Sequence, residues 1–269
     1  MSALLTDLHQ SCSDFEFWQH YDGLLSEVFE KHPLTGEPMR TRLFGFERLT
    51  DRQQTNFSVP AKGSVFGFVI EGSAVVKLSG QSRAYASIEQ GQWFSLSNGI
   101  DLSLAVGTRV LAIQSMGFYG LNATGGPIEP AGRLRYIDRC SDTLLAPPPL
   151  LGDPCLNHLH FPDGIEQTQH THPTGRFGAV VRGSGYCETP SGRYDLLPGL
   201  IFHIPAEGRH RFVTLEQSMD VIAFHPDSDW GPTDQNHPMI NRTLVEGEKL
   251  NNSNARHDGP QILGWVATH

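Results

Sequence analysis

The chain has few cysteines, and none of them are paired in a motif. Its four cysteines lie far apart without a Cys-X-X-Cys pair: Cys12, Cys140, Cys155 and Cys187. A disulfide framework or a thiolate zinc site needs patterned thiols, so the sequence argues against both. We therefore expect free thiols in a reducing cytosol.

The sequence also lacks basic runs and long apolar runs. The formal net charge is −9 and lysines and arginines are scattered, which argues against nucleic acid or an anionic membrane as a partner. No stretch approaches the roughly eighteen apolar residues of a membrane span. The first ten residues, MSALLTDLHQ, have neither the basic region nor the apolar core of a signal peptide. We expect a soluble, cytoplasmic protein.

Glycine and proline, by contrast, are abundant. The 28 glycines and 18 prolines, with a 38% hydrophobic share, are typical of a protein rich in turns and strands. From about Thr41, short apolar runs alternate with turn pairs such as Glu71-Gly72 and Asn98-Gly99. Short strands at this regular spacing predict an all-β sandwich or barrel.

One helix is predicted, near the N-terminus. Ser13 followed by Glu16 is a capping-box pattern. Apolar residues then recur at helical spacing before Pro33, at Phe15, Trp18, Tyr21, Leu25, Val28 and Phe29. We expect this short N-terminal helix to pack on the outside of a barrel or on a partner subunit.

Histidines occur in a defined pattern in the second half of the chain. Residues 164–183 read Gly, five residues, His-Thr-His, three residues, Arg, six residues, Gly, and residues 199–210 read Gly, five residues, Pro-Ala-Glu-Gly-Arg-His. His170 and His172, two apart on a strand, point to the same face because side chains alternate. His210, arriving from a later strand, can close three imidazoles around one metal ion.

This spacing resembles the two-part signature of the cupin superfamily. The resemblance implies a double-stranded β-helix, the cupin jelly roll, in which His170, His172 and His210 are the metal ligands. The chain departs from the signature at three positions. Arg176 stands where the signature has a glutamate ligand, Glu207 replaces a glycine, and Thr214 replaces the final asparagine. We expect the adjacent Gly208 to supply the turn that Glu207 interrupts.

A faint internal repeat predicts two tandem barrels. Residues 66–72 resemble residues 177–183, and residues 88–91 resemble residues 196–199, at offsets of 111 and 108 residues. In the first copy, Phe57, Val59 and Leu102 fall near the positions of the three histidines, and none of them can bind a metal. The first barrel is therefore expected to be structural.

The repeat suggests a division of the chain into four parts. We predict an N-terminal helical segment at residues 1–35, a degenerate cupin barrel without metal ligands at 36–130, a metal-binding cupin barrel at 131–232, and a capping segment with a tail at 233–269. The Gly- and Pro-rich stretch 117–132 carries the boundary between the barrels.

The charge at the expected site leaves two interpretations of Arg176. Three neutral imidazoles do not offset the charge of a divalent ion, and Arg176 adds a further positive charge. Its guanidinium either binds a carboxylate of the substrate, as a catalytic residue, or turns away to pair with Asp or Glu at the barrel mouth. The pair His158 and His160 forms a second polar layer, an accessory site, or simply hydrogen-bonded polar positions of a strand. His203 and His225 are expected to be structural.

The function expected from the resemblance is that of a metal-dependent enzyme. A three-histidine site without an acidic ligand resembles the sites of the cupin ferrous dioxygenases that act on thiols, β-diketones and gentisate-type aromatics. This implies one divalent ion per chain, with Fe(II) preferred over Zn, Mn or Ni, a small anionic organic substrate, dioxygen, and a homodimer. Two alternatives stay open: a Zn, Mn or Ni isomerase, lyase or decarboxylase, and a non-enzymatic bicupin that binds small molecules.

Overall fold

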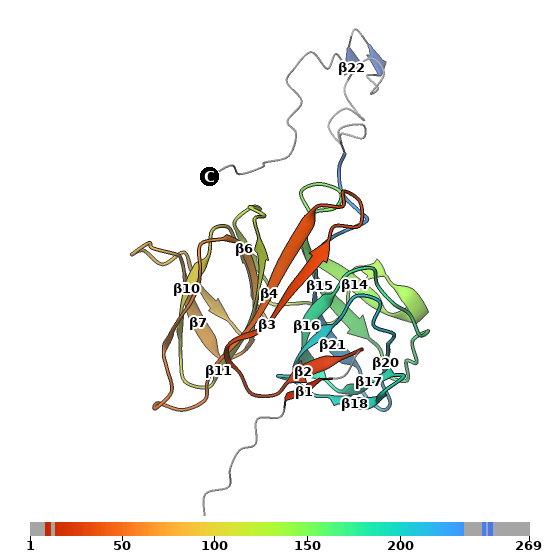
Figure 1. The fold of residues 1–269 in the computed structure, drawn as a ribbon, viewed down its shortest axis with the longest axis horizontal. Helices are drawn as coiled ribbons and strands as arrows, with labels where there is room; N and C mark the ends of the chain where they lie inside the picture. Colours follow the sequence, from red (N-terminus) through yellow and green to blue (C-terminus); the bar gives the residue numbers. More distant parts are fainter. Residues whose placement is uncertain (1–8, 12–13, 234–243, 246, 250–269) are drawn as a thin grey trace, which may run out of the picture.

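The computed structural model describes residues 9–11, 14–233, 244–245 and 247–249. These residues form strands and a single 3-10 turn, Ile137–Arg139, and no helix among them is long and apolar enough to cross a membrane. Figure 1 shows two β-barrels side by side, the first in orange and yellow and the second in green to blue. The predicted all-β fold, a double-stranded β-helix in two tandem barrels, is confirmed.

The first barrel consists of two antiparallel sheets with an apolar core between them. One sheet has the order β12-β9-β6-β11-β4-β3 and the other β5-β10-β7-β8. Their bounds are β3 Asp22–Lys31, β4 Pro38–Arg48, β5 Asn56–Val59, β6 Gly63–Glu71, β7 Ser73–Leu78, β8 Ala86–Glu89, β9 Trp93–Leu96, β10 Ile100–Leu104, β11 Thr108–Met116 and β12 Ala123–Gly125. Phe57, Val59 and Leu102 belong to this core and are at most 6% exposed, so apolar side chains fill the positions that correspond to the histidines.

The second barrel has the same construction. Its larger sheet has the order β1-β2-β19-β16-β21-β15-β14-β13, and its smaller sheet β18-β17-β20. Their bounds are β1 His9–Ser11, β2 Glu16–Trp18, β13 Leu134–Arg135, β14 Ser141–Ala146, β15 Cys155–Phe161, β16 Arg176–Gly183, β17 Gly185–Thr189, β18 Gly192–Leu196, β19 Ile201–Ile204, β20 Arg211–Val213 and β21 Met219–His225. A separate hairpin joins β22 Leu244–Val245 to β23 Glu248–Lys249.

The two halves of the sequence repeat occupy matching places. β6 lies between β9 and β11, and β16 lies between β19 and β21. A Cβ atom on Gly67 of β6 would lie 2.1 Å from the Phe94 ring, and one on Gly178 of β16 would lie 2.7 Å from the Phe202 ring. In each barrel, a side chain at this glycine would collide with an aromatic ring from the neighbouring strand, β9 in the first barrel and β19 in the second, so glycine is required there.

The prediction of an N-terminal helix is wrong. Within the described part of residues 1–35 the chain forms strands instead, with β2 paired to β19 of the second barrel and β3 paired to β4 of the first. Figure 1 shows the red β1 and β2 on the second barrel and β3 beside β4. Phe15 and Phe17, two residues apart, are both buried in the core of the second barrel. Pairing with distant strands thus overrode a spacing that also fits a helix.

The two barrels also share a hydrophobic core. Phe66 of the first barrel packs against Phe224 of the second with ring centroids 5.0 Å apart, and both belong to one buried cluster with Trp18 and Phe177. The N-terminal strand β2 supplies Trp18 to this cluster. The position of the boundary between the two barrels, within residues 117–132, stays a prediction.

Candidate metal centre

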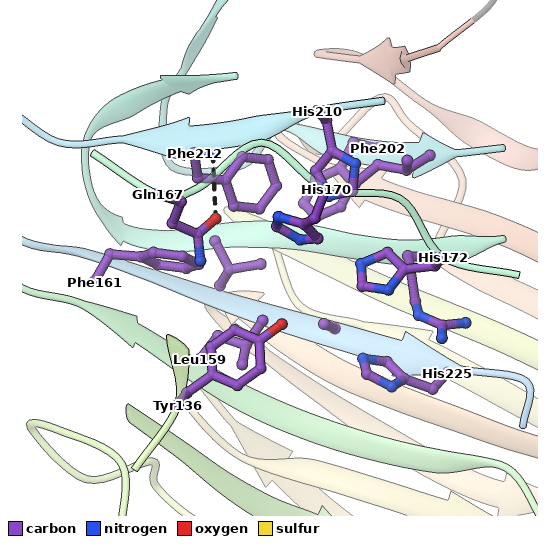
Figure 2. A pocket seen from close by; sticks show the side chains of 14 residues that line it. Tyr136, Leu159, Phe161, Gln167, His170, His172, Phe202, His210, Phe212 and His225 are labelled. Atoms are coloured by element: carbon purple, nitrogen blue, oxygen red, sulfur yellow. Dashed lines mark hydrogen bonds between the residues drawn. The ribbon is translucent and has the colours of Figure 1, made fainter. Parts of the chain in front are cut away.

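Three histidines meet at one point inside the second barrel. His170 and His210 lie opposite each other on neighbouring backbone segments, and each backbone N–H donates to the other's carbonyl at 3.0 Å. The carbonyl of His172 accepts a hydrogen bond from the N–H of Glu207 at 2.8 Å. One ligand atom from each histidine lies within 4.8 Å of the other two, and Figure 2 shows the three rings grouped around one space. The structure thus brings together the residues that the motif singled out.

Backbone carbonyls determine which nitrogen of two rings can bind a metal. Nδ1 of His170 lies 2.8 Å from the carbonyl oxygen of Thr168, and Nδ1 of His210 lies 2.9 Å from that of Gly208. Because a carbonyl oxygen can only accept, each Nδ1 carries the proton and donates it. Nε2 therefore keeps its lone pair, as in metal-binding histidines whose other ring nitrogen is held by a backbone carbonyl.

This donor set fits a divalent metal ion. Within the described residues the cluster comprises only the three imidazoles, without a carboxylate or a thiolate. Three neutral nitrogen ligands leave further coordination positions open, as catalytic sites do, and suit Fe, Zn, Ni, Cu or Mn. We conclude that the second barrel carries a candidate site for one divalent metal ion.

The turn before His210 differs from the expectation. Glu207 itself adopts the left-handed conformation, with φ of 59°, whereas Gly208 does not. Gly208 is needed for another reason: a Cβ atom there would lie 2.9 Å from the carbonyl oxygen of Pro205 and 3.0 Å from that of Asp14. Glycine therefore permits a close backbone approach at this position, and the turn is made by a glutamate in a conformation that favours glycine.

Arg176, the first residue of β16, is paired with a carboxylate. Its Nη1 donates to Oδ1 of Asp227 at 3.1 Å, to the hydroxyl of Thr174 at 2.6 Å and to the carbonyl of Gly175 at 3.1 Å. The side chain is buried, and its Nε has no hydrogen-bond partner among the described residues. Of the two interpretations of Arg176, pairing with an acid is therefore observed. The residue nevertheless lines the same cavity as the three histidines.

The cavity beside the histidines is small and mostly apolar. Its volume is ≈ 30 Å³, and besides the histidines and Arg176 it is lined by Tyr136, Leu159, Phe161, Gln167, Phe202, Ile204, Phe212, Val221, Ala223 and His225. About 10–15 Å³ of such space holds one water molecule, so an ion and a very small ligand fill it. Figure 2 shows the Tyr136 hydroxyl and the His225 ring directed toward the histidine cluster.

Three polar residues of this cavity, Tyr136, Gln167 and His225, were not identified from the sequence as residues of the site. His225 was expected to be structural, yet its ring centroid lies 6.4 Å from that of His172. His225 follows Val221 and Ala223 on β21 at intervals of two residues. Because alternate side chains of a strand point to the same face, its inward direction could be predicted once β21 had been located. Tyr136 lies in a turn between β13 and β14, where no periodicity signals which way a side chain points.

Three further histidines of the second barrel are paired with acids. His158 Nε2 and His160 Nδ1 both donate to Oδ1 of Asp220, at 2.7 and 2.9 Å, and Arg182 Nε donates to Oδ2 at 2.9 Å. His203 Nδ1 donates to Glu16 at 3.0 Å. His158 and His160 are thus hydrogen-bonded polar residues of a strand, and His203 is held by its acid as expected of a structural residue.

The electrostatic environment keeps two of the clustered histidines neutral. Burial, with a further contribution from Arg176, lowers the pKa of His172 to about 3. Burial lowers the pKa of His210 to about 4, although its hydrogen bond to Gly208 acts in the opposite direction. Both rings are therefore unprotonated at neutral pH, which is the form that binds metals.

These pKa values predict acid sensitivity of the metal-free protein. The unfolded chain binds protons on these histidines below about pH 6.5, whereas the folded protein does not until about pH 4. Stability should therefore fall as the pH drops from 6.5 to 4, by up to about 1.4 kcal/mol per pH unit for each histidine. Urea unfolding of chelator-treated protein across this range measures the slope. A His172→Ala variant with the same slope as the unmodified protein would contradict the assignment.

Comparison with known proteins identifies the fold and not the activity. No family model and no curated protein sequence matches this chain. Solved structures do match: a cupin 2 conserved barrel domain protein from Leptotrichia buccalis (TM-score 0.51, 10% identity, 76% of this chain and 89% of that one) and the protein Ylba from E. coli (0.54, 15%, 86% and 98%). A salicylate 1,2-dioxygenase from Pseudaminobacter salicylatoxidans also matches (0.50, 11%, 74% and 76%). At these identities the likeness concerns the fold.

Proposed function

We propose that this chain, which has the cupin fold, is a non-haem Fe(II) dioxygenase that acts on a small carboxylate-bearing molecule in its second barrel. The observation that carries the proposal is the cluster of three imidazoles without an acidic ligand among the described residues. A metal ion held by three neutral ligands keeps its full positive charge and favours an anionic substrate. When bound, a ferrous ion would supply the redox chemistry that activates dioxygen.

The residues around the cluster have distinct roles in this proposal. His170, His172 and His210 hold the ion, and carbonyls fix the direction of two of the rings. Arg176 lines the same cavity with its charge paired to Asp227, which holds its Nη1 so that the remaining guanidinium N–H groups keep a fixed direction. A substrate carboxylate near this guanidinium would gain a charge-assisted hydrogen bond.

The small volume of the cavity limits the size of the substrate. Most binding pockets for drug-sized ligands have volumes of roughly 300–1,000 Å³, far above the ≈ 30 Å³ beside the three histidines. We therefore favour a carboxylic acid of only a few heavy atoms. The phenylalanines and leucine of the lining, Phe161, Phe202, Phe212 and Leu159, would exclude water from the reacting groups. The salicylate 1,2-dioxygenase shares this fold, and the reaction proposed here rests on the histidine cluster rather than on that likeness.

Oxygen consumption tests this function directly. Iron-loaded protein is mixed with a panel of two- to four-carbon carboxylic acids, including 2-oxo, 2-hydroxy and thiol acids, and dissolved oxygen is recorded. We expect oxygen uptake that needs both iron and one class of acid, and that is lost in His210→Ala. Turnover without oxygen in the zinc or manganese form would instead favour an isomerase, lyase or decarboxylase. Binding of an acid without any turnover would favour a non-enzymatic bicupin.

A further inference from the structure

A strained turn lies against the cavity, between β13 and β14. In this turn, residues 136–140, Asp138 and Arg139 both adopt positive φ values, 53° and 67°. The turn is closed by the N–H of Tyr136, which donates to the carbonyl of Cys140 at 2.9 Å, and by the N–H of Cys140, which donates to Ile137 at 3.0 Å. Two consecutive non-glycine residues in left-handed conformations are unfavourable, and such strain persists where surrounding contacts impose it.

The contacts that impose this conformation connect the turn to the histidine cluster. The N–H of Thr168 donates to Oδ2 of Asp138 at 2.6 Å, and its hydroxyl lies 3.2 Å from Oδ1. The carbonyl of Thr168 accepts the Nδ1 proton of His170 at 2.8 Å. One residue, Thr168, is therefore held by the Asp138 carboxylate on one side and orients the His170 ring on the other.

The same turn directs a phenol into the cavity. Tyr136 lines the cavity and packs against the core of the second barrel, and Figure 2 shows its hydroxyl pointing toward the space beside the histidines. Within the described part of the chain, no residue forms a hydrogen bond with this hydroxyl. Burial raises the pKa of Tyr136, so the phenol keeps its proton and remains a donor at neutral pH.

We infer that two residues of the turn at residues 136–140, Tyr136 and Asp138, belong to the binding site. The hydroxyl of Tyr136 donates a hydrogen bond to the anion bound beside the metal. Asp138 is a positioning residue, because its carboxylate holds both the turn that carries Tyr136 and the Thr168 carbonyl that orients His170. This inference rests on the metal and the anionic ligand of the proposed function, and it adds a ligand contact from outside the histidine motif.

Binding of acetate to the cobalt-loaded protein tests both roles. Co²⁺ gives the site a visible absorption spectrum, so Co²⁺ affinity and the acetate-induced spectral change are measured on one sample. Tyr136→Phe should keep the Co²⁺ affinity and raise the acetate Kd roughly tenfold or more, because one hydrogen bond to a charged ligand is lost. Asp138→Ala should weaken Co²⁺ binding by about 10–100-fold, as changes behind a metal-binding histidine do.

Two further variants serve as controls. Ile137→Ala removes an exposed side chain from the same turn and should leave both affinities unchanged. Asp138→Asn keeps one side-chain oxygen that can accept the hydrogen bond from the Thr168 N–H. It should therefore retain part of the Co²⁺ affinity that Asp138→Ala loses, and it replaces Asp138→Ala as the test if that variant is poorly folded. Urea unfolding of every variant separates loss of the site from loss of the fold.

The outcomes distinguish this inference from the proposed function. An unchanged acetate Kd in Tyr136→Phe overturns the role of Tyr136, and an unchanged Co²⁺ affinity in Asp138→Ala overturns that of Asp138. If the unmodified protein binds Co²⁺ but acetate leaves its spectrum unchanged, the anion site fails and this inference fails with it. A protein that consumes no oxygen but shows the expected acetate result contradicts only the dioxygenase activity.

Discussion

Replacing His210 with alanine is expected to abolish metal binding while the protein stays folded. His210 is 2% exposed and supplies one of the three donor atoms that the described residues contribute to the cluster. Changes behind a metal ligand already weaken binding by about 10–100-fold, so loss of a ligand itself should cost at least about 100-fold. The folded state persists because the barrel core is apolar, with Phe161, Phe202 and Val221 among its buried residues.

Metal analysis and competition with a chelator measure this effect, and circular dichroism with urea unfolding reports the fold. Thr171→Ala is the matched control, because Thr171 lies between His170 and His172 and is exposed. It should bind metal like the unmodified protein. If His210→Ala retained a full complement of tightly bound metal, the three-histidine site would be wrong. If it failed to fold, the ion would have to be a structural element of the barrel.

Replacing Asp227 with alanine is expected to cause a large loss of stability. Asp227 is buried, and its carboxylate pairs with Nη1 of Arg176, which is 9% exposed, and with the hydroxyl of Thr174. Removing one partner of a buried ion pair leaves the other charge uncompensated, at a cost of about 3–5 kcal/mol. The double variant Arg176→Met with Asp227→Ala removes both charges and should recover most of this loss.

Urea unfolding of the single and double variants measures the coupling between the two residues. Asp229→Ala, which removes an exposed carboxylate two residues away, is the control and should change the free energy of unfolding by less than about 0.5 kcal/mol. A loss below about 1 kcal/mol in Asp227→Ala would mean that Arg176 is compensated by something else. It would also remove the reason for treating its guanidinium as fixed in direction.

The histidine cluster could be predicted from the sequence because the spacing of its residues resembles a known family signature. His170 and His172 are two residues apart, and His210 follows at the spacing that the second part of the signature requires. The fold followed from the same pattern together with regularly spaced strands and turns. The predictions from the histidine spacing and from the alternation of strands and turns agreed with the structure, whereas the prediction from helical spacing near the N-terminus did not.

The remaining features depend on partners that are distant in sequence. Asp227 is 51 residues from Arg176 and follows the last strand of the barrel, so the alternatives for Arg176 could not be decided in advance. Tyr136 reaches the cavity from a turn with left-handed residues, which carries no periodic signal. The N-terminal residues have apolar spacing that suits a helix, and only pairing with β19 and β4 makes them strands.

The central claim is that three imidazoles hold a single metal ion inside the second barrel. Anomalous diffraction from crystals of the protein as purified, recorded on both sides of the absorption edge of each candidate metal, tests it most directly. The account predicts one peak about 2.0–2.2 Å from Nε2 of His170, from Nε2 of His210 and from a ring nitrogen of His172, at the iron edge. A peak bound by a carboxylate of the chain, or no peak among the three rings, would contradict it.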